Sequence, residues 1–162
     1  MQDTTQSSDQ FKVLTERGEQ YVKDSIDDMR LPSVDIDKLL TNDNLRERVR
    51  DDYISEDYET TVFKAFKLLE EKVRSISGQE PEVIGASLMS RVFNPTNCLI
   101  SHPDVETAAE KEGLHHLMRG AIMWFKNPTS HRTVGYHDPE SVAHVLSFAN
   151  LLLDLVDQCQ RN

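Results

Sequence analysis

The sequence predicts an all-α protein, a bundle of at least four principal helices. Three observations lead to this prediction. Apolar residues recur at spacings of three and four over several long stretches, which is the period of a helix that buries one face. Helix starts and stops such as Asp138-Pro139-Glu140 and Gly78 bound these stretches. No segment alternates polar and apolar residues as a half-buried strand does, and no glycine-rich phosphate loop is present.

The chain divides into an acidic N-terminal extension, residues 1–43, and a helical domain, residues 44–162. Residues 1–9 are rich in Gln, Asp, Thr and Ser, a composition typical of disorder. Residues 10–30 carry apolar residues at helical spacing and predict one amphipathic helix, which the glycine at position 18 weakens. Residues 33–43 contain several acids and predict a linker or a helix-capping loop.

Residues 44–54 predict a short helix in which Arg46, Arg48 and Arg50 alternate with Leu45 and Val49. The favoured interpretation of these arginines is a solvent-exposed face. A patch that contacts phosphate is the alternative, and the acidic residues between the arginines weaken it.

The strongest helix prediction starts after Ser55, which can cap it, and ends at Gly78. Its apolar residues follow the spacing of a buried stripe. They are Val62, Phe66, Leu69, Val73 and Ile76. A further helix is predicted to start near Pro81 and to end at Asn94, before a loop at residues 95–105.

Two apolar helices complete the domain. The first runs from Leu114 to Phe125, where Trp124 and Phe125 are predicted to be core or interface residues. The second begins at Asp138, an N-cap followed by proline, and has a broad apolar face. Such a face is typical of a central bundle helix or of half a dimer interface.

Between these two helices lies the polar segment, residues 126–132, which contains no acid. Pro128 lacks an N–H and disfavours the α conformation at Asn127. We therefore expect the helix to stop near Lys126 and to restart with Asn127 as N-cap. Such a break would let Lys126 and His131 face one ligand, because residues five apart on an unbroken helix point about 140° apart.

Composition limits the function. A chain of 162 residues with 38% hydrophobic content suffices for one domain and its core. A net charge of −10 argues against a protein that coats nucleic acid. From residue 111 onward, however, acids and bases balance, and no acid lies between Gly113 and His137. A local cationic site on an acidic body is compatible with selective RNA contact, and also with none.

The two cysteines, Cys98 and Cys159, form no metal-binding or disulfide pattern, which favours a reducing cytoplasm. The N-terminus lacks a basic-then-apolar signal, and Asp154 interrupts the longest apolar run, so we expect no membrane segment. No cluster of His and carboxylate residues is placed to bind a metal, so we expect neither a metal nor another cofactor.

Residues 126–131, Lys-Asn-Pro-Thr-Ser-His, resemble the Arg-polar-x-x-x-His signature of HEPN domains, with Lys126 in place of the arginine. Residues 113–121, Gly-Leu-His-His-Leu-Met-Arg-Gly-Ala, together with Asn127-Pro128 and His131-Arg132, resemble the Ymh-type branch of HEPN-like proteins, whose members are conserved hypothetical proteins. Residues 58–78 resemble its first long helix, and the likeness spans roughly residues 45–160. It implies an up-down HEPN-like bundle. It also implies a metal-independent endoribonuclease, a toxin or phage-defence effector, in which two motifs meet across a homodimer built on the last two helices.

RNA cleavage by its own 2′-hydroxyl needs only proton transfer and stabilisation of charge on the phosphate. His131 suits acid–base work because histidine, with an unperturbed pKa of about 6.5, changes charge near neutrality. Lys126 would face the phosphate, and Asn127 would orient the imidazole or the scissile group. Lysine lacks the two-pronged donor of arginine. The candidate RNA-binding residues are Arg119, Thr129, Ser130 and Arg132, of which Arg132 could supply that fork.

Less specific interpretations remain open. His131 could be a loop histidine bonded to a backbone carbonyl, Lys126 a cation favoured at a helix C-terminus, and Asn127-Pro128 only a helix break. The alternative function is a catalytically weak or inactive HEPN-fold module that binds a protein partner, such as a nucleotidyltransferase-like antitoxin or a larger defence protein. The substitution at Lys126 and the acidic body favour that alternative. A metal-dependent hydrolase ranks last.

Overall fold

The computed structural model describes residues 34–162, so the disorder predicted for residues 1–9 and the helix predicted for residues 10–30 lie outside the described residues. The described part is mostly helical, which confirms the all-α prediction at that level. Its helices are α2 (Ile36–Leu39), α3 (Asp43–Ile54), α4 (Tyr58–Ser77), α5 (Gly85–Val92), α6 (Ala108–Ala121), the π-helical turn η1 (Ile122–Lys126), α7 (Asn127–His131) and α8 (Pro139–Gln158). None of these helices is long and apolar enough to cross a membrane.

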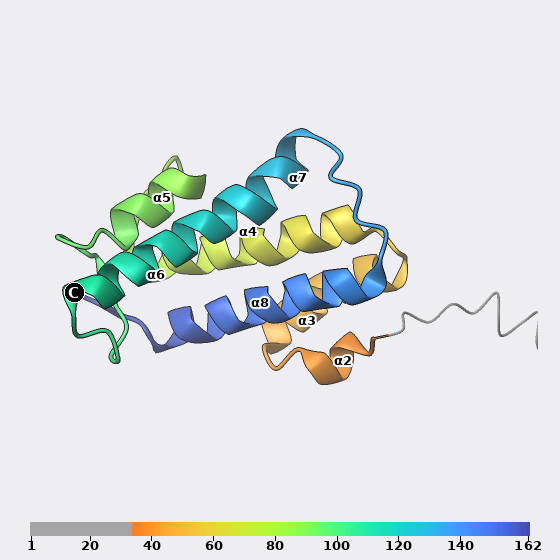
Figure 1. The fold of residues 1–162 in the computed structure, drawn as a ribbon, viewed down its shortest axis with the longest axis horizontal. Helices are drawn as coiled ribbons and strands as arrows, with labels where there is room; N and C mark the ends of the chain where they lie inside the picture. Colours follow the sequence, from red (N-terminus) through yellow and green to blue (C-terminus); the bar gives the residue numbers. More distant parts are fainter. Residues whose placement is uncertain (1–33) are drawn as a thin grey trace, which may run out of the picture. The chain divides into compact units, whose positions relative to one another are not determined.

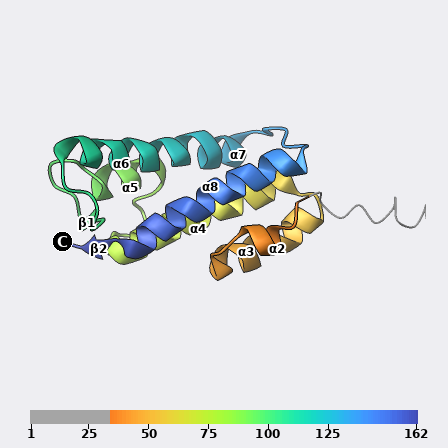
Figure 2. The same cartoon turned by 60° about the horizontal axis from the view of Figure 1, so that its bottom comes forward.

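The helices form three layers. The two longest, α4 and α8, pack side by side and run in the same direction, whereas α6, η1 and α7 form one continuous rod that runs the opposite way (Figure 1). Figure 2 shows this rod on one side of α4 and α8, and α2 with α3 on the other. The short helix α5 packs between α6 and α4.

The core lies around α4. Its predicted stripe is buried as expected from Val62 to Val73, and Ile76 packs against the core at its edge. The apolar face of α8 meets it through fully buried residues such as Leu146 and Leu152. This assigns most of that face to the core of the bundle, although Leu151 on the same helix remains 54% exposed.

Several helix boundaries follow the predicted caps. Gly78 ends α4 in a left-handed conformation with φ of 65°, and Asp138 caps α8 by accepting a hydrogen bond from the Ser141 amide. The prediction for Ser55 was wrong, because Asp57 caps α4 whereas Ser55 ends α3. The prediction for Pro81 was also wrong, because α5 starts only at Gly85.

Two short elements were not predicted from the sequence. Asp35 caps the four-residue helix α2, within residues predicted as a linker or loop. Strand β1 (Ile100–Ser101) pairs antiparallel with β2 (Gln160–Arg161), which ties the predicted loop to the end of the chain. Elements this short are below the length at which periodicity carries a signal.

Candidate functional site

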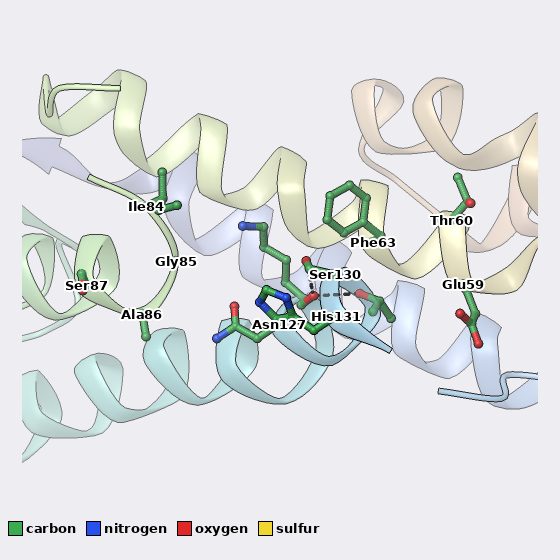
Figure 3. Close-up of a pocket in the computed structure, with 12 residues that line it drawn as sticks. Glu59, Thr60, Phe63, Ile84, Gly85, Ala86, Ser87, Asn127, Ser130 and His131 are labelled. Carbon is green, nitrogen blue, oxygen red and sulfur yellow. Dashed lines mark hydrogen bonds between the residues drawn. The ribbon is translucent and has the colours of Figure 1, made fainter. Parts of the chain in front are cut away.

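A cavity of about 800 Å³ opens between three segments: the first turns of α4, the start of α5, and the rod where η1 meets α7 (Figure 3). Five of the seven candidate site residues line it. They are Lys126, Asn127, Thr129, Ser130 and His131. The facing segments contribute Glu59, Thr60 and Phe63 from α4 and residues 84–87 from the start of α5. The structure therefore brings most of the polar segment to one cavity.

The helix does not break at Asn127, so that prediction was wrong. Asn127 has helical backbone angles, φ −61° and ψ −44°, and its N–H donates to the carbonyl of Ile122, five residues back. Pro128 removes one donor and crowds the preceding turn, and the wider π-helical turn relieves that crowding without ending the helix. Phe125 anchors the turn from inside, because its ring stacks on Phe66 at 4.8 Å between centroids.

The hydroxyls of Thr129 and Ser130 donate hydrogen bonds to backbone carbonyls of the turn before Pro128. Thr129 donates to the carbonyls of Phe125 at 3.0 Å and Lys126 at 2.8 Å. Ser130 donates to the same Lys126 carbonyl at 2.9 Å. Both hydroxyl protons are used in these hydrogen bonds within the helix. Toward a ligand, Thr129 and Ser130 can therefore only accept hydrogen bonds.

The Lys126 side chain points toward α4. Its ammonium lies 2.7 Å from a carboxylate oxygen of Glu70, on α4, and its side chain is only 14% exposed. The same Glu70 oxygen accepts the Gly85 N–H at 3.0 Å, and the other oxygen lies 2.7 Å from the Arg74 guanidinium. Glu70 therefore joins α4, the start of α5 and the polar segment. We call Glu70, Arg74 and Lys126 the charge triad; its formal charge is one positive unit.

The carboxylate of Glu70 is ionised in this setting. Burial alone would raise its pKa, but hydrogen bonds from Lys126 and Arg74 outweigh burial, and the Gly85 amide adds to them. The net effect is a pKa below its ordinary value. One N–H of the Lys126 ammonium is used on Glu70, and within residues 34–162 the other two meet no protein acceptor. Lys126 thus keeps donors for an anion in the cavity.

Asn127 and His131 lie one helical turn apart on the same side of the rod, and both line the cavity (Figure 3). The His131 side chain is exposed, and within residues 34–162 its imidazole makes no hydrogen bond or ion pair. The Asn127 side-chain oxygen lies close to the start of α5, since a Cβ added to Gly85 would be 3.8 Å from it. The imidazole is therefore free to act on a ligand.

Arg119 and Arg132 do not line the cavity. Both are exposed, Arg119 on α6 and Arg132 just after α7. The backbone at Arg132 turns to an extended conformation, φ −156° and ψ 160°, which ends α7. Arg132 therefore does not supply a guanidinium to the cavity within this chain.

Two acidic residues at the site were missed from the sequence. Glu70 follows Leu69 on the buried side of α4, and an acid at such a position is a signal for a buried cationic partner. Glu59, in the first turn of α4, lines the cavity and accepts the amides of Val134 and Gly135, each at 2.8 Å. Glu59 thereby fixes the loop that follows α7.

A second polar cluster, His115 and His116, lies on α6. The rings of His115 and His116 stack at 5.2 Å, outside the cavity, and burial lowers the pKa of His115. Among residues 34–162, no three His, Cys, Asp or Glu side chains are grouped so that they could hold a metal ion.

The sequence of the chain matches a known protein family. The model of a family described as "Protein of unknown function (Hypoth_ymh)" matches residues 40–156. No curated protein and no solved structure matched the chain. The family match supports the resemblance to Ymh proteins drawn from residues 113–132.

Proposed function

The chain belongs to the Hypoth_ymh family, and we propose that it is a metal-independent endoribonuclease of the HEPN type that acts as a homodimer. The observation that carries this proposal is the placement of Lys126, Asn127 and His131 around one open cavity. The arrangement of one long rod running against α4 and α8 supports an up-down HEPN-like bundle. A toxin or antiviral-defence effector is the biological role that the resemblance implies.

The proposed reaction uses the RNA's own 2′-hydroxyl. His131 of one subunit accepts the hydroxyl proton while the 2′-oxygen bonds to phosphorus. The bond from phosphorus to the 5′-oxygen breaks, and His131 of the second subunit donates a proton to that oxygen. The products are a 2′,3′-cyclic phosphate and a 5′-hydroxyl. Lys126 stabilises the charge on the non-bridging oxygens, and Asn127 orients the imidazole or the phosphate.

The charge triad prepares Lys126 for this role. Glu70 holds the ammonium at the cavity wall, so its position requires little ordering when the phosphate arrives. The net positive charge of the triad leaves a cation to meet the phosphate even though one N–H is occupied. Lysine in place of arginine is therefore compatible with activity, although an ammonium has two N–H donors fewer than a guanidinium.

Exposed apolar side chains on the α6–α7 rod and on α8 support a homodimer through the last two helices. Trp124 is 74% exposed, Met123 44% and Leu117 39%, all on α6 and η1, and Leu151 on α8 is 54% exposed. Large apolar side chains at a surface are enriched where a second chain docks. Trp124 lies two residues from Lys126, so this contact would lie next to the polar segment in sequence but on another face of the rod, because residues two apart on a helix do not face each other.

The test is cleavage of a mixed-sequence RNA in EDTA by the wild type, His131→Ala and His144→Ala. His144 is an exposed histidine on α8 outside the cavity, so it is the matched control. We expect His131→Ala to lose about 100-fold or more of the rate, the usual contribution of a general acid or base, while His144→Ala cuts like the wild type. Equal cleavage by His131→Ala and wild type would remove His131 from the mechanism.

A second candidate function is a non-catalytic module that binds a protein partner. The observation that favours it is that Lys126, Thr129 and Ser130 all make bonds within the fold, so part of the motif serves the structure. A purified protein that neither binds nor cuts RNA, yet co-purifies with a nucleotidyltransferase-like antitoxin or a larger defence protein, would favour this function over the first.

A further inference from the structure

Two carboxylates of α4 hold the polar segment and the loop after it from opposite ends. Glu70 pairs with the Lys126 ammonium, where the polar segment begins, at 2.7 Å. Glu59, about three helical turns earlier on α4, accepts the backbone amides of Val134 and Gly135, each at 2.8 Å. Residues about three turns apart lie on the same face of a helix. One face of α4 therefore contacts the chain both before and after α7.

The two contacts fit the length of chain between them. Three turns of α4 rise about 16 Å. From Lys126 to His131 the chain is helical and rises about 8 Å. The residues after His131 begin in an extended conformation, and three of them can cover about 10 Å. The rod runs opposite to α4 (Figure 1), so both contacts form at once while α7 stays helical.

The loop after α7 depends on Glu59. Within residues 34–162, residues 133–137 make no hydrogen bond other than the two to Glu59. Tyr136 adds an apolar contact with the core. His131 is the last residue of the five-residue helix α7, and in the same part of the chain its imidazole has no hydrogen-bond partner. The position of His131 is therefore set by what holds the chain on either side of α7.

The contact uses one oxygen of Glu59. Both amides donate to Oε1, and Oε2 meets no donor from the residues that the structure describes. Glu59 lines the cavity together with His131, but the two lie apart in it (Figure 3). The negative charge of Glu59 would repel a phosphate, whereas its reach from α4 to the loop serves the site. The useful property of Glu59 is thus an acceptor oxygen at the right distance.

We propose that Glu59 is a positioning residue for the cleavage, which holds the loop after α7 and thereby fixes His131 at the cavity. This inference rests on the proposed function, because His131 is the group that Glu59 positions. Glu59 touches neither the phosphate nor the 2′-hydroxyl in this role. A general acid or base misplaced by about 1 Å can lose a large part of its effect on rate, so a contact several residues away matters for catalysis.

The experiment separates reach from charge. Glu59→Gln removes the charge but keeps the length and a carbonyl oxygen with two lone pairs, which can accept both amides. Glu59→Asp keeps the charge but is shorter by one methylene, and an acid stays favourable in the first turn of α4. The matched controls are Glu47→Gln and Glu47→Asp. Glu47 is exposed on α3 outside the cavity, and within residues 34–162 its side chain makes no hydrogen bond or ion pair.

The first readout is cleavage of RNA in EDTA, with kcat and KM measured separately. Glu59→Asp should lower kcat about 10- to 100-fold, the size expected for a misplaced catalytic group. Its KM should stay near the wild-type value, because the cavity residues that meet the phosphate are unchanged. Glu59→Gln should restore most of the wild-type kcat, and both Glu47 variants should cut like the wild type.

The second readout needs no RNA. Relaxation of ¹⁵N-labelled backbone amides in the full chain reports the order at His131, Val134 and Gly135. We expect order parameters near 0.85, the value of rigid backbone, at all three in the wild type and Glu59→Gln, and a fall toward about 0.6 in Glu59→Asp. Thermal melting checks that each variant is folded.

Three results would overturn the assignment. The first is a wild-type kcat in Glu59→Asp, which leaves the cleavage itself in place. The second is Glu59→Gln as impaired as Glu59→Asp, which would make charge the important property. The third is order lost at Val134 and Gly135 but kept at His131, since Glu59 would then hold only the loop. A wild type that does not cut RNA defeats the proposed function instead, and the relaxation data alone then decide whether Glu59 positions His131.

Discussion

Removing the charge of Glu70 should destabilise the fold far more than removing the charge of its neighbour Glu71. Glu70 is 6% exposed and holds two cations, Arg74 at 19% and Lys126 at 14% exposure. Breaking a buried ion pair from one side costs about 3–5 kcal/mol because the remaining charge is left without a partner. The two cations are partly open to solvent, so we expect Glu70→Gln to lie at the lower end, about 3 kcal/mol.

Glu71→Gln is the matched control. Glu71 pairs with Arg48 at 2.9 Å on the surface, where the two side chains are 38% and 34% exposed. Exposed pairs contribute about 0–1 kcal/mol, so this variant should unfold nearly like the wild type. The assay is urea unfolding at pH 7 followed by far-UV circular dichroism. Thermal melts should agree, with Glu70→Gln lowering Tm by about 6–12 °C in a chain of this size.

A double-mutant cycle identifies the partner. Lys126→Met leaves Glu70 with Arg74 and the Gly85 amide, so alone it should cost less than Glu70→Gln. Combining the two changes removes one orphaned cation, and we expect a coupling energy of about 1–2 kcal/mol between them. A cost for Glu70→Gln within 1 kcal/mol of that for Glu71→Gln, or a coupling near zero, would refute the charge triad as a structural unit.

The same carboxylate makes stability depend on pH in one direction. Its pKa is lower in the folded chain than in the unfolded one, so the unfolded state binds more protons in acid. The stabilisation from Glu70 is fully present above the unfolded pKa and is lost as pH falls through the folded pKa. Glu70→Gln should therefore show a smaller loss of stability on acidification than Glu71→Gln does, measured by urea unfolding at a series of pH values.

Three further predictions follow from single residues. Gly85→Ala should cost about 1–3 kcal/mol in urea unfolding, because φ is +60° there, whereas Gly120→Ala, on the open face of α6, should not destabilise the chain. Thr129→Val should cost about 1 kcal/mol through the lost bonds to the carbonyls before Pro128, and an unchanged midpoint would contradict this. Burial raises the pKa of Cys159 to about 11, so a thiol reagent at pH 8 should label Cys98 in the native protein and Cys159 only after unfolding.

Local patterns predicted the parts of the fold that depend on neighbours in sequence. The stripe from Val62 to Val73 was recognisable because a helix that buries one face must repeat its apolar residues at its own period. Gly78 and Asp138 were recognisable because a helix end needs partners for its free backbone groups. These signals are contained within a few residues of the chain.

The interior of the candidate site was not predictable in that way. Glu70 and Lys126 are 56 residues apart, and their pairing arises only when α4 and η1 pack together. The break expected at Asn127 rested on local steric preference, which the fold overrides by widening one turn and by seating Phe125 against Phe66. The residues that meet at the cavity were recognisable from chemistry and resemblance, but their geometry was not.

Replacing Lys126 gives the most direct test of whether the charge triad serves the proposed cleavage. An ammonium bonded to Glu70 has two N–H groups left, whereas a guanidinium bonded in the same way would have four of its five. If Lys126 contacts the phosphate, Lys126→Arg should cut RNA at least as fast as the wild type, and Lys126→Met should lose about 10- to 100-fold, the value of one charge-assisted hydrogen bond. Both rates are measured in EDTA with folding checked by thermal melting. Lys126→Met that folds and cuts like the wild type would leave Lys126 as a structural partner of Glu70 alone, with the phosphate bound by other groups.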